Sequence, residues 1–274
     1  MKYELIHELQ VPKVGFGTWS IGGQSTPDLS LDSVSRAALR SALELGYTHF
    51  DTAEYYADGH AEELLGQTIR EMGVRREDLF LTTKVSPEHL HADDILRACD
   101  RSLRRLGVDF VDLYLIHWPN PRIKLEESFG ALNRLVREGK VRYLGVSNFK
   151  LKMLQESMAL SETPLLTNQV PYSLPEKTYL DNGVIAYCQQ NDILVTAYSP
   201  VKFRNLNVNA TLKAIAAAHG ATSYQVALAW LIAQPRIITI PMSFDPAHQK
   251  ENLEAMNLEL SASETEQLSN LYSR

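Results

Sequence analysis

The sequence has few cysteines, no basic block and no long apolar run, and each absence excludes a class of protein. Its 274 residues contain two cysteines, too few for the disulfide framework of a small secreted domain. The 27 lysines and arginines stand against 33 aspartates and glutamates, so nucleic acids and other polyanions are not expected partners. The first segment, MKYELIHELQVPKVG, resembles neither a signal peptide nor a membrane span. We therefore expect a cytoplasmic protein without a membrane partner.

A G-x-G-x-x-G turn after the first strand-like run is also missing, which argues against an open, doubly wound sheet that binds dinucleotides. Eight short β-like runs, each followed by a helical pattern, are present instead: VGFGTW, YTHFD, LFLTTK, VDLYLIH, VRYLGVS, LLTNQV, ILVTAYS and RIITIP. Strict alternation of strand and helix means parallel strands joined by right-handed crossovers. Eight such units predict an α/β protein with a (β/α)₈ TIM barrel, whose usual size is about 250 residues.

No linker, low-complexity tract or charge block divides the chain, so residues 1–274 are predicted to form a single domain. The segment KYELIHELQVPK has two apolar stretches around a polar turn, and we expect a short hairpin that caps the lower end of the barrel.

The intervening segments have the 3.6-residue spacing of amphipathic helices. Examples of the apolar stripes are Val34, Ala38, Ala42, Leu45 and Leu125, Phe129, Leu132, Val136. These helices are expected to end at Gly46, Gly107 and Gly139. Cys99 falls on a third stripe, with Ile95, Leu103 and Leu106, and is interpreted as a core residue; Cys188 is interpreted in the same way.

Polar residues end most of the predicted strands, where the active site of such a barrel lies. They are Asp51, Lys84, His117, Ser147, Asn148, Asn168, Gln169, Tyr198 and Ser199. Taken singly, Lys84 could be a solvated strand end, His117 a core histidine and Asp51 a helix cap. Together, an acid, a lysine and a histidine on three consecutive parallel strands are expected to face one another, because buried charges need partners.

This set suits proton delivery to a carbonyl oxygen. A tyrosine has a pKa of about 10 and is a poor acid near neutral pH unless a cation stabilises its phenolate. Lys84 can be that cation, Asp51 can keep Lys84 charged, and His117 can hydrogen-bond the oxygen. Two adjacent tyrosines, Tyr55 and Tyr56, follow Asp51 in HFDTAEYYADG, and the chemistry alone does not choose between them.

At these residues the sequence resembles the aldo-keto reductase superfamily, through nearly the whole chain. The family pattern, approximately D-T-A-x-x-Y-G, stands here as DTAEYYA at residues 51–57, with Ala57 in the last position, and its spacing selects Tyr56. The resemblance implies that Tyr56 is the general acid, that Lys84 lowers the Tyr56 pKa, that Asp51 supports Lys84, and that His117 orients the carbonyl. Trp19 and Trp118 match positions that line the substrate pocket, which favours aromatic or aliphatic carbonyls over highly charged ones. Tyr55 becomes an aromatic residue that lines this pocket or packs against the barrel rim.

The family's cofactor is a nicotinamide dinucleotide held without a Rossmann fold. The resemblance places Ser147 and Asn148 at the carboxamide with Gln169 beside them, and stacks Tyr198 on the nicotinamide ring. The full set of expected cofactor residues is Thr18, Ser147, Asn148, Gln169, Tyr198, Ser199, Pro200, Val201, Met242, Ser243, His248, Glu251 and Asn252. No metal is expected.

The segment IPMSFDPAHQKENL departs from the family pattern. Relatives commonly carry a lysine and an arginine that hold the 2′-phosphate of NADPH, where this chain has Met242 and His248. We therefore expect NADP or NAD as cofactor, with relaxed or NADH-leaning use, although Lys250 or a protonated His248 would restore part of the phosphate binding. After Tyr198 a glycine of the family pattern is also missing. Lys202 and Arg204 could supply charge to the pyrophosphate instead, or they belong to a solvated loop.

The sequence thus predicts an NAD(P)H-dependent oxidoreductase that reduces small aldehydes and ketones as a monomer. Two alternatives stay open. One is a barrel lyase in which Lys84 forms a Schiff base, although pairing with Asp51 would keep that amine charged. The other is a cofactor-sensing regulatory subunit, which the fold alone does not exclude.

Overall fold

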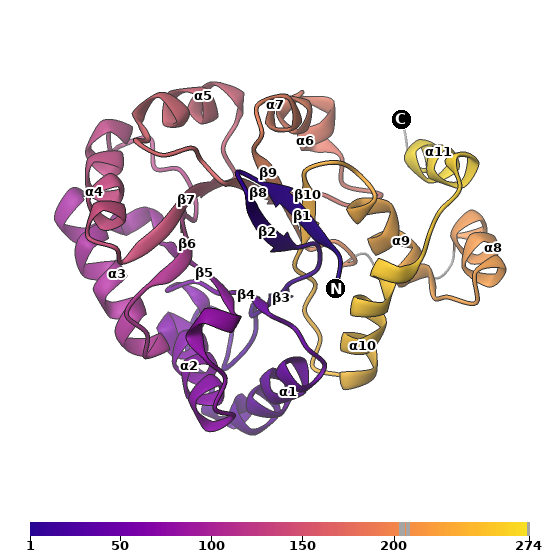
Figure 1. Ribbon diagram of the computed structural model, residues 1–274, viewed down its shortest axis with the longest axis horizontal. Coiled ribbons are helices and arrows are strands. Elements are labelled where there is room, and N and C mark those ends of the chain that lie inside the picture. Colours follow the sequence, from indigo (N-terminus) through magenta and orange to yellow (C-terminus); the bar gives the residue numbers. More distant parts are fainter. Residues whose placement is uncertain (203–205, 207–208, 273–274) are drawn as a thin grey trace.

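In a computed structural model of the protein, which describes residues 1–202, 206 and 209–272, a closed ring of strands is surrounded by helices (Figure 1). The main sheet has eight parallel strands in the order β10-β9-β8-β7-β6-β5-β4-β3. They are β3 (Phe16–Gly17), β4 (His49–Asp51), β5 (Phe80–Val85), β6 (Val111–Ile116), β7 (Val141–Ser147), β8 (Thr167–Pro171), β9 (Leu194–Tyr198) and β10 (Ile237–Thr239). Each of the eight predicted runs therefore contains a strand.

The first and last strands meet through a short parallel contact. Val14 bridges to Thr239, and the Gly15 amide donates a 2.8 Å hydrogen bond to the Thr239 carbonyl. This contact closes the sheet, so the predicted (β/α)₈ barrel is confirmed.

The predicted N-terminal hairpin is also present. Strands β1 (Tyr3–Ile6) and β2 (Leu9–Pro12) pair antiparallel, and the two turn residues between them, His7 and Glu8, both have positive φ. Figure 1 shows the hairpin lying across the middle of the ring. Ile6 and Val11 form one buried cluster with side chains from the barrel interior, Phe80, Leu113, Leu115, Leu166, Leu194 and Ile238. The hairpin thus plugs the barrel at the end opposite the carboxyl ends of the strands.

Helices cover the outside of the ring (Figure 1). The α-helices are α1 (Asp32–Glu44), α2 (His60–Glu71), α3 (Ala92–Leu106), α4 (Leu125–Arg137), α5 (Leu151–Leu160), α6 (Thr178–Asp181), α7 (Val184–Gln190), α8 (Ala210–Ala218), α9 (Ser223–Ile232), α10 (Pro246–Glu254) and α11 (Ala262–Asn270). Short 3₁₀ turns are η1 (Leu29–Leu31), η2 (Tyr56–Gly59), η3 (Arg76–Asp78), η4 (Pro87–His89) and η6 (Ala255–Asn257). Among the described helices, none is long and apolar enough to cross a membrane.

The helix stripes are confirmed with one correction. Cys99, Ile95, Leu103 and Leu106 are buried on α3, and Cys188 is buried on α7. Val34, however, is exposed, because α1 buries Ser35, Ala38, Leu39 and Ala42 instead. A residue next to the buried face in sequence points about 100° away from it on a helix, so Val34 lies outside the stripe that its spacing suggested.

Candidate active site

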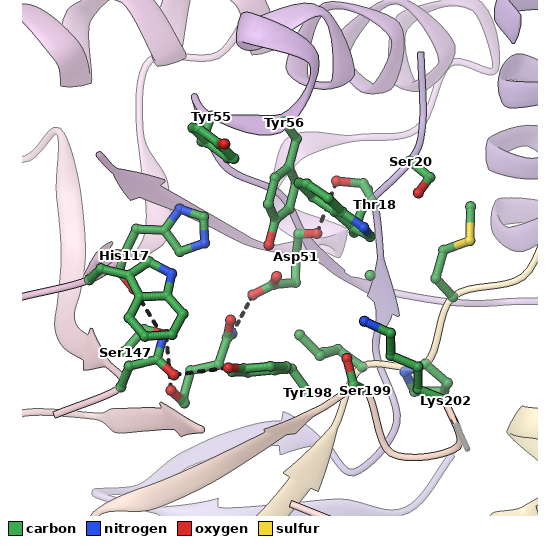
Figure 2. A pocket seen from close by; sticks show the side chains of 18 of the residues that line it. Thr18, Ser20, Asp51, Tyr55, Tyr56, His117, Ser147, Tyr198, Ser199 and Lys202 are labelled. Atoms are coloured by element: carbon green, nitrogen blue, oxygen red, sulfur yellow. Dashed lines mark hydrogen bonds between the residues drawn. The ribbon is translucent and has the colours of Figure 1, made fainter. Parts of the chain in front are cut away.

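One cavity of about 820 Å³ lies at the carboxyl ends of the barrel strands (Figure 2). It is lined by most of the residues that the sequence singled out: Thr18, Trp19, Asp51, Tyr55, Tyr56, His117, Trp118, Ser147, Asn148, Gln169, Tyr198, Ser199, Pro200, Val201 and Met242. Lys84 lies behind this wall and is fully buried. Ser243, His248, Glu251 and Asn252 do not line the cavity but follow Met242 on the segment that runs into α10.

Lys84 is the centre of the buried polar network. Its Nζ donates to Asp51 Oδ1 at 2.5 Å, to the Thr52 carbonyl at 2.7 Å and to the Tyr56 hydroxyl at 3.3 Å. Burial acts to lower the Lys84 pKa, but the nearby Asp51 charge and the Tyr56 hydroxyl outweigh it, and the pKa is raised above its ordinary value. The amine is therefore held in its charged form beside the Tyr56 hydroxyl.

Tyr56 is the tyrosine that the structure brings to Lys84. Its side chain is buried, and the Lys84 Nζ also lies 4.8 Å from the centre of its ring. Tyr55, the neighbour in sequence, is 45% exposed and makes no hydrogen bond to Lys84. The geometry therefore distinguishes the two tyrosines that the chemistry of the sequence left open.

The direction of the Tyr56 pKa differs from the expectation. Burial raises it, the Lys84 charge lowers it and the Asp51 charge raises it again, so that the net shift is upward. The expectation considered the cation and neglected the removal of the phenolate from water, which is the larger effect here. Lys84 still makes proton release easier than it would be for an equally buried tyrosine without a cation.

The backbone after Tyr56 makes an unusually tight turn. Ala57, Asp58 and Gly59 all have positive φ, and the Ala57 amide donates to the Gln24 carbonyl at 2.6 Å. Ser20, Asn148 and Ser199, which line the cavity, also have positive φ without being glycine. Such conformations cost free energy and cluster at functional sites, where the surrounding structure fixes them.

His117 packs against the Tyr56 ring. The two ring centroids are 5.5 Å apart in an edge-to-face arrangement, and the His117 ring also meets the edge of Tyr55 at 6.1 Å. Burial, with a smaller effect of the Lys84 charge, lowers the His117 pKa to about 3. The imidazole is therefore neutral near pH 7, and one ring nitrogen can donate a hydrogen bond into the cavity.

Asp51 has a second partner that the sequence did not indicate. Gln169 Nε2 donates to Asp51 Oδ2 at 2.8 Å, while Lys84 occupies Oδ1. Gln169 was expected only beside a bound carboxamide. The sequence did indicate that Asp51 and Gln169 lie near the carboxyl ends of their strands. Their separation along the chain, however, gave no reason to pair them.

The opposite wall is a chain of polar side chains beside an aromatic ring. The Tyr198 hydroxyl donates to Asn148 Oδ1 at 2.9 Å, and Asn148 Nδ2 donates to Ser147 Oγ at 2.9 Å. Ser147 Oγ in turn donates to the Gln169 carbonyl at 2.9 Å. The Tyr198 ring is thereby fixed at the cavity surface, half-buried, with amide groups next to it. A flat ring that carries a carboxamide fits this arrangement of a ring face and adjacent hydrogen-bonding groups.

The segment after β10 has Met242 and His248 at the two positions where relatives commonly carry a lysine and an arginine. Met242 lines the cavity with its thioether, and His248 is exposed on α10. In addition, Asp245 caps the N-terminus of α10, with Oδ1 accepting from the Ala247 amide at 2.8 Å. Gln249 is buried and ties Ser243 to α1 through its Nε2, a role that the sequence did not reveal. A carboxylate thus lies where a phosphate would meet the start of the helix.

The sequence also offered Lys202, Lys250 and Arg204 as contacts to the phosphates of the cofactor. Lys202 lines the cavity with an exposed side chain, on the side of Ser199 and away from His117 (Figure 2). Lys250 lies 3.7 Å from Glu254 on the outer face of α10. Arg204 lies outside the described residues.

The chain was compared with known proteins. A family model described as the aldo/keto reductase family matches residues 13–273. The chain is 38% identical to the methylglyoxal reductase YeaE of Escherichia coli K12 over 271 residues, which are 97% of this chain and 92% of that protein. It is 34% identical to the glyoxal reductase of Bacillus subtilis strain 168, covering 97% and 90% of the two chains.

Solved structures give the same picture. The thermostable aldo-keto reductase Tm1743, in complex with the inhibitor epalrestat, superposes with a TM-score of 0.94 at 44% identity, covering 99% of this chain and 100% of that chain. An aldo/keto reductase from Klebsiella pneumoniae in complex with NADP and acetate superposes with a TM-score of 0.89 at 36% identity, covering 99% and 95%. These similarities extend over the barrel and the cavity together.

Proposed function

The chain belongs to the aldo/keto reductase family and is an oxidoreductase that reduces carbonyl compounds with a nicotinamide cofactor; we propose that Tyr56 is its proton donor. The observation that carries this proposal is the Tyr56 hydroxyl 3.3 Å from the charged Lys84 Nζ, at the wall of the cavity. Neither the lyase nor the regulatory alternative is supported, and an enclosed, charged Lys84 is a poor amine nucleophile.

A reduced nicotinamide, when bound, supplies the hydride that reduces the carbonyl carbon. Tyr56 donates its phenolic proton to the carbonyl oxygen, and Lys84 stabilises the phenolate that remains. Neutral His117 donates a hydrogen bond to the same oxygen as negative charge develops there. Asp51 and Gln169 keep the Lys84 amine charged and aimed at Tyr56.

We propose that Ser147, Asn148, Gln169 and Tyr198 hold the nicotinamide end of the cofactor, because together they present a ring face and amide groups to the cavity. We propose that the other expected residues continue this contact towards the adenosine end of the cofactor. They are Thr18, Ser199, Pro200, Val201, Met242, Ser243, His248, Glu251 and Asn252. The Thr18 amide donates to the Asp51 carbonyl at 2.9 Å, which supports a cofactor contact at Thr18 near the proposed proton donor.

We further propose relaxed or NADH-leaning cofactor use. Charge-assisted hydrogen bonds are worth roughly 1.5–3 kcal/mol each, so the two missing cations cost about two to four powers of ten in relative NADPH affinity, and less at an exposed phosphate. The Asp245 carboxylate at the start of α10 adds repulsion towards a 2′-phosphate. In the wild-type protein, NADPH bound a hundredfold more tightly than NADH would contradict this proposal.

The test of the proton donor compares Tyr56→Phe with Tyr55→Phe. Oxidation of NADH and of NADPH is followed by absorbance with methylglyoxal and with an aromatic aldehyde. Tyr56→Phe is expected to lower kcat by at least a thousandfold while cofactor Kd changes by less than about threefold, because only the transferable proton is lost. Tyr55→Phe keeps its ring and is expected to remain active. Normal turnover by Tyr56→Phe would contradict the assignment.

The substrate, the monomeric state and the cytoplasmic location stay predictions. The relatives named above are methylglyoxal and glyoxal reductases, so small dicarbonyls are the first substrates to test. A monomeric state is checked by sedimentation with and without cofactor, and a cytoplasmic location by cell fractionation.

A further inference from the structure

Three half-exposed aromatic side chains gather at the rim of the cavity. Trp19 is 41% exposed, Tyr55 45% and Trp118 48%, and all three line the cavity. The third tryptophan of the chain, Trp230, is buried. Large aromatic side chains held partly in water at one place typically mark a surface that binds something.

Aromatic rings pack around the groups proposed to bind the carbonyl. The Trp19 and Tyr55 rings stack with their planes parallel to within 4° and their centroids 6.3 Å apart. Trp19 also meets Tyr56 edge-on at 5.1 Å, and Tyr55 meets His117 edge-on at 6.1 Å. The substituent of a carbonyl bound between Tyr56 and His117 therefore lies next to Trp19 and Tyr55.

The charged groups on the cavity wall are unevenly distributed. The ionisable acids and amines that line it, among the described residues, are Asp51, Glu88 and Lys202. Asp51 is already paired with the buried Lys84, and Lys202 lies beside Ser199, away from Tyr55 and His117 (Figure 2). Glu88 has no ion-pair or hydrogen-bond partner within the described parts of the chain. Within the described residues, the substrate side thus carries an uncompensated carboxylate and, with His117 neutral, no cation.

Glu88 is held at this rim by its neighbours. It lies on η4, next to Pro87, and both residues line the cavity. Glu54 is buried beneath this turn: its Oε1 accepts from the Ser86 amide at 2.8 Å and from His89 Nδ1 at 2.9 Å. Arg101 donates to Glu54 Oε2 at 3.3 Å and offsets its charge. These bonds to Ser86 and His89 fix the turn on both sides and keep its backbone at the cavity mouth, where the Glu88 side chain is exposed.

We propose that Glu88 discriminates against carbonyl substrates that bear a carboxylate. This inference rests on the proposed carbonyl reduction at Tyr56 and His117. It names the class of substrate that the cavity wall disfavours. The chemical reason is that a substrate carboxylate entering the mouth meets Glu88 and finds no cation among the described residues on that side.

The experiment compares two aldehydes of the same shape, neutral 4-formylbenzamide and anionic 4-formylbenzoate. The ratio of their kcat/KM values, benzoate over benzamide, is measured at low salt for the wild type, Glu88→Gln and Glu88→Lys. Two unit charges about 8 Å apart at a wet surface change this ratio by roughly threefold to tenfold per charge. The ratio is therefore expected to rise stepwise from wild type to Glu88→Gln to Glu88→Lys, and to rise in the wild type as salt is added.

Glu156→Gln is the matched control, because it makes the same change in net charge on an exposed face of α5, outside the cavity. Its ratio is expected to equal that of the wild type. If 4-formylbenzamide is reduced but the ratio is unaffected by both Glu88 substitutions, the inference on Glu88 is wrong while the proposed reaction stands. If neither aldehyde is reduced with either nicotinamide, both are wrong.

Discussion

The amide of Gln169 donates to the carboxylate of Asp51 across the full width of the barrel. β8 and β4 are four strands apart in a closed ring of eight, so the two side chains approach from opposite walls. This bond fixes the oxygen of Asp51 that Lys84 does not use, and it forms the floor of the cavity beneath Tyr56. The proposed catalytic network is therefore completed by a strand that carries none of its charged members.

Gln169→Leu tests this relationship. The substitution leaves one oxygen of a buried carboxylate without a donor, which costs about 1.5–3 kcal/mol in the free energy of unfolding. We also expect kcat to fall about tenfold, because Asp51 is then free to draw Lys84 away from Tyr56. Urea unfolding and steady-state kinetics measure the two effects.

The control for this variant is Gln189→Leu. Gln189 Nε2 also donates to an oxygen, the Pro235 carbonyl at 2.9 Å, but at an exposed site. It is expected to cost less than about 1 kcal/mol. A Gln169→Leu protein as stable and as active as this control would show that the cross-barrel bond is unimportant.

Two buried histidines predict a loss of stability in mild acid. Burial lowers the pKa of His49 to about 4 and that of His117 to about 3, from 6.5 for an exposed histidine. The unfolded chain takes up these protons below about pH 6.5, whereas the folded protein does not. Stability is therefore full above pH 6.5 and falls as the pH drops towards 4, by on the order of 3 kcal/mol for each histidine.

The measurement is the number of protons taken up on unfolding near pH 5, from the slope of unfolding free energy against pH. His117→Phe is expected to reduce that number by about one. His248→Gln, which removes an exposed histidine on α10, is the control. Equal slopes for His117→Phe and the wild type would mean that His117 is already protonated in the folded protein.

Restoring the cations tests the cofactor proposal. In the double variant Met242→Lys and His248→Arg, the ratio of NADPH to NADH affinity is expected to rise by about two powers of ten or more. Asp245→Asn removes the carboxylate but keeps a side-chain acceptor for the Ala247 amide, and a smaller rise of about threefold is expected.

Cofactor affinities are measured by fluorescence quenching at fixed ionic strength. Lys250→Gln serves as the control, because its charge lies on the outer face of α10 beside Glu254. A double variant with an unchanged affinity ratio would show that the 2′-phosphate binds elsewhere.

Glu54→Gln separates substrate binding from chemistry. The neutral amide is a weaker hydrogen-bond acceptor for Arg101 and His89, so the turn that carries Pro87 and Glu88 is expected to shift. The hydrogen bond from Lys84 to Tyr56 does not involve Glu54 and is expected to remain. We expect KM for 4-formylbenzamide to rise several-fold more than kcat falls.

Glu127→Gln is the comparison for this substitution. Glu127 accepts from His91 and from the Ala92 amide, the same kinds of donor, but at an exposed site outside the cavity. Its kinetics are expected to match the wild type. A fall in kcat without a rise in KM for Glu54→Gln would place Glu54 with the proton-delivery network instead.

The barrel could be predicted from the sequence because its strands are buried on both faces. Such strands appear as short, nearly continuous apolar runs, and each of the eight runs holds one. Their polar ends were equally visible, since Asp51, Lys84 and His117 each follow such a run. Val34 shows the limit for helices, where one residue of offset separates a buried position from an exposed one.

Other features of the site depend on the three-dimensional arrangement. The contact between Gln169 and Asp51 joins residues that are 118 positions apart, and no local pattern encodes it. The Tyr56 pKa depends on a balance between burial and charge that the sequence does not supply. The hydrogen bond from the Ser86 amide to Glu54 could not be predicted, because its donor is a backbone group that every residue other than proline has.

The proton-delivery residues and those assigned to the cofactor come from different halves of the chain. Asp51, Tyr56, Lys84 and His117 precede residue 120, and apart from Thr18 the proposed cofactor contacts begin at Ser147. Substitutions that change nicotinamide use can therefore accumulate in the second half without altering how the proton is delivered. A chimaera joined between α4 and β7 would exchange one property and keep the other, provided that a donor remains at position 169 to meet Asp51.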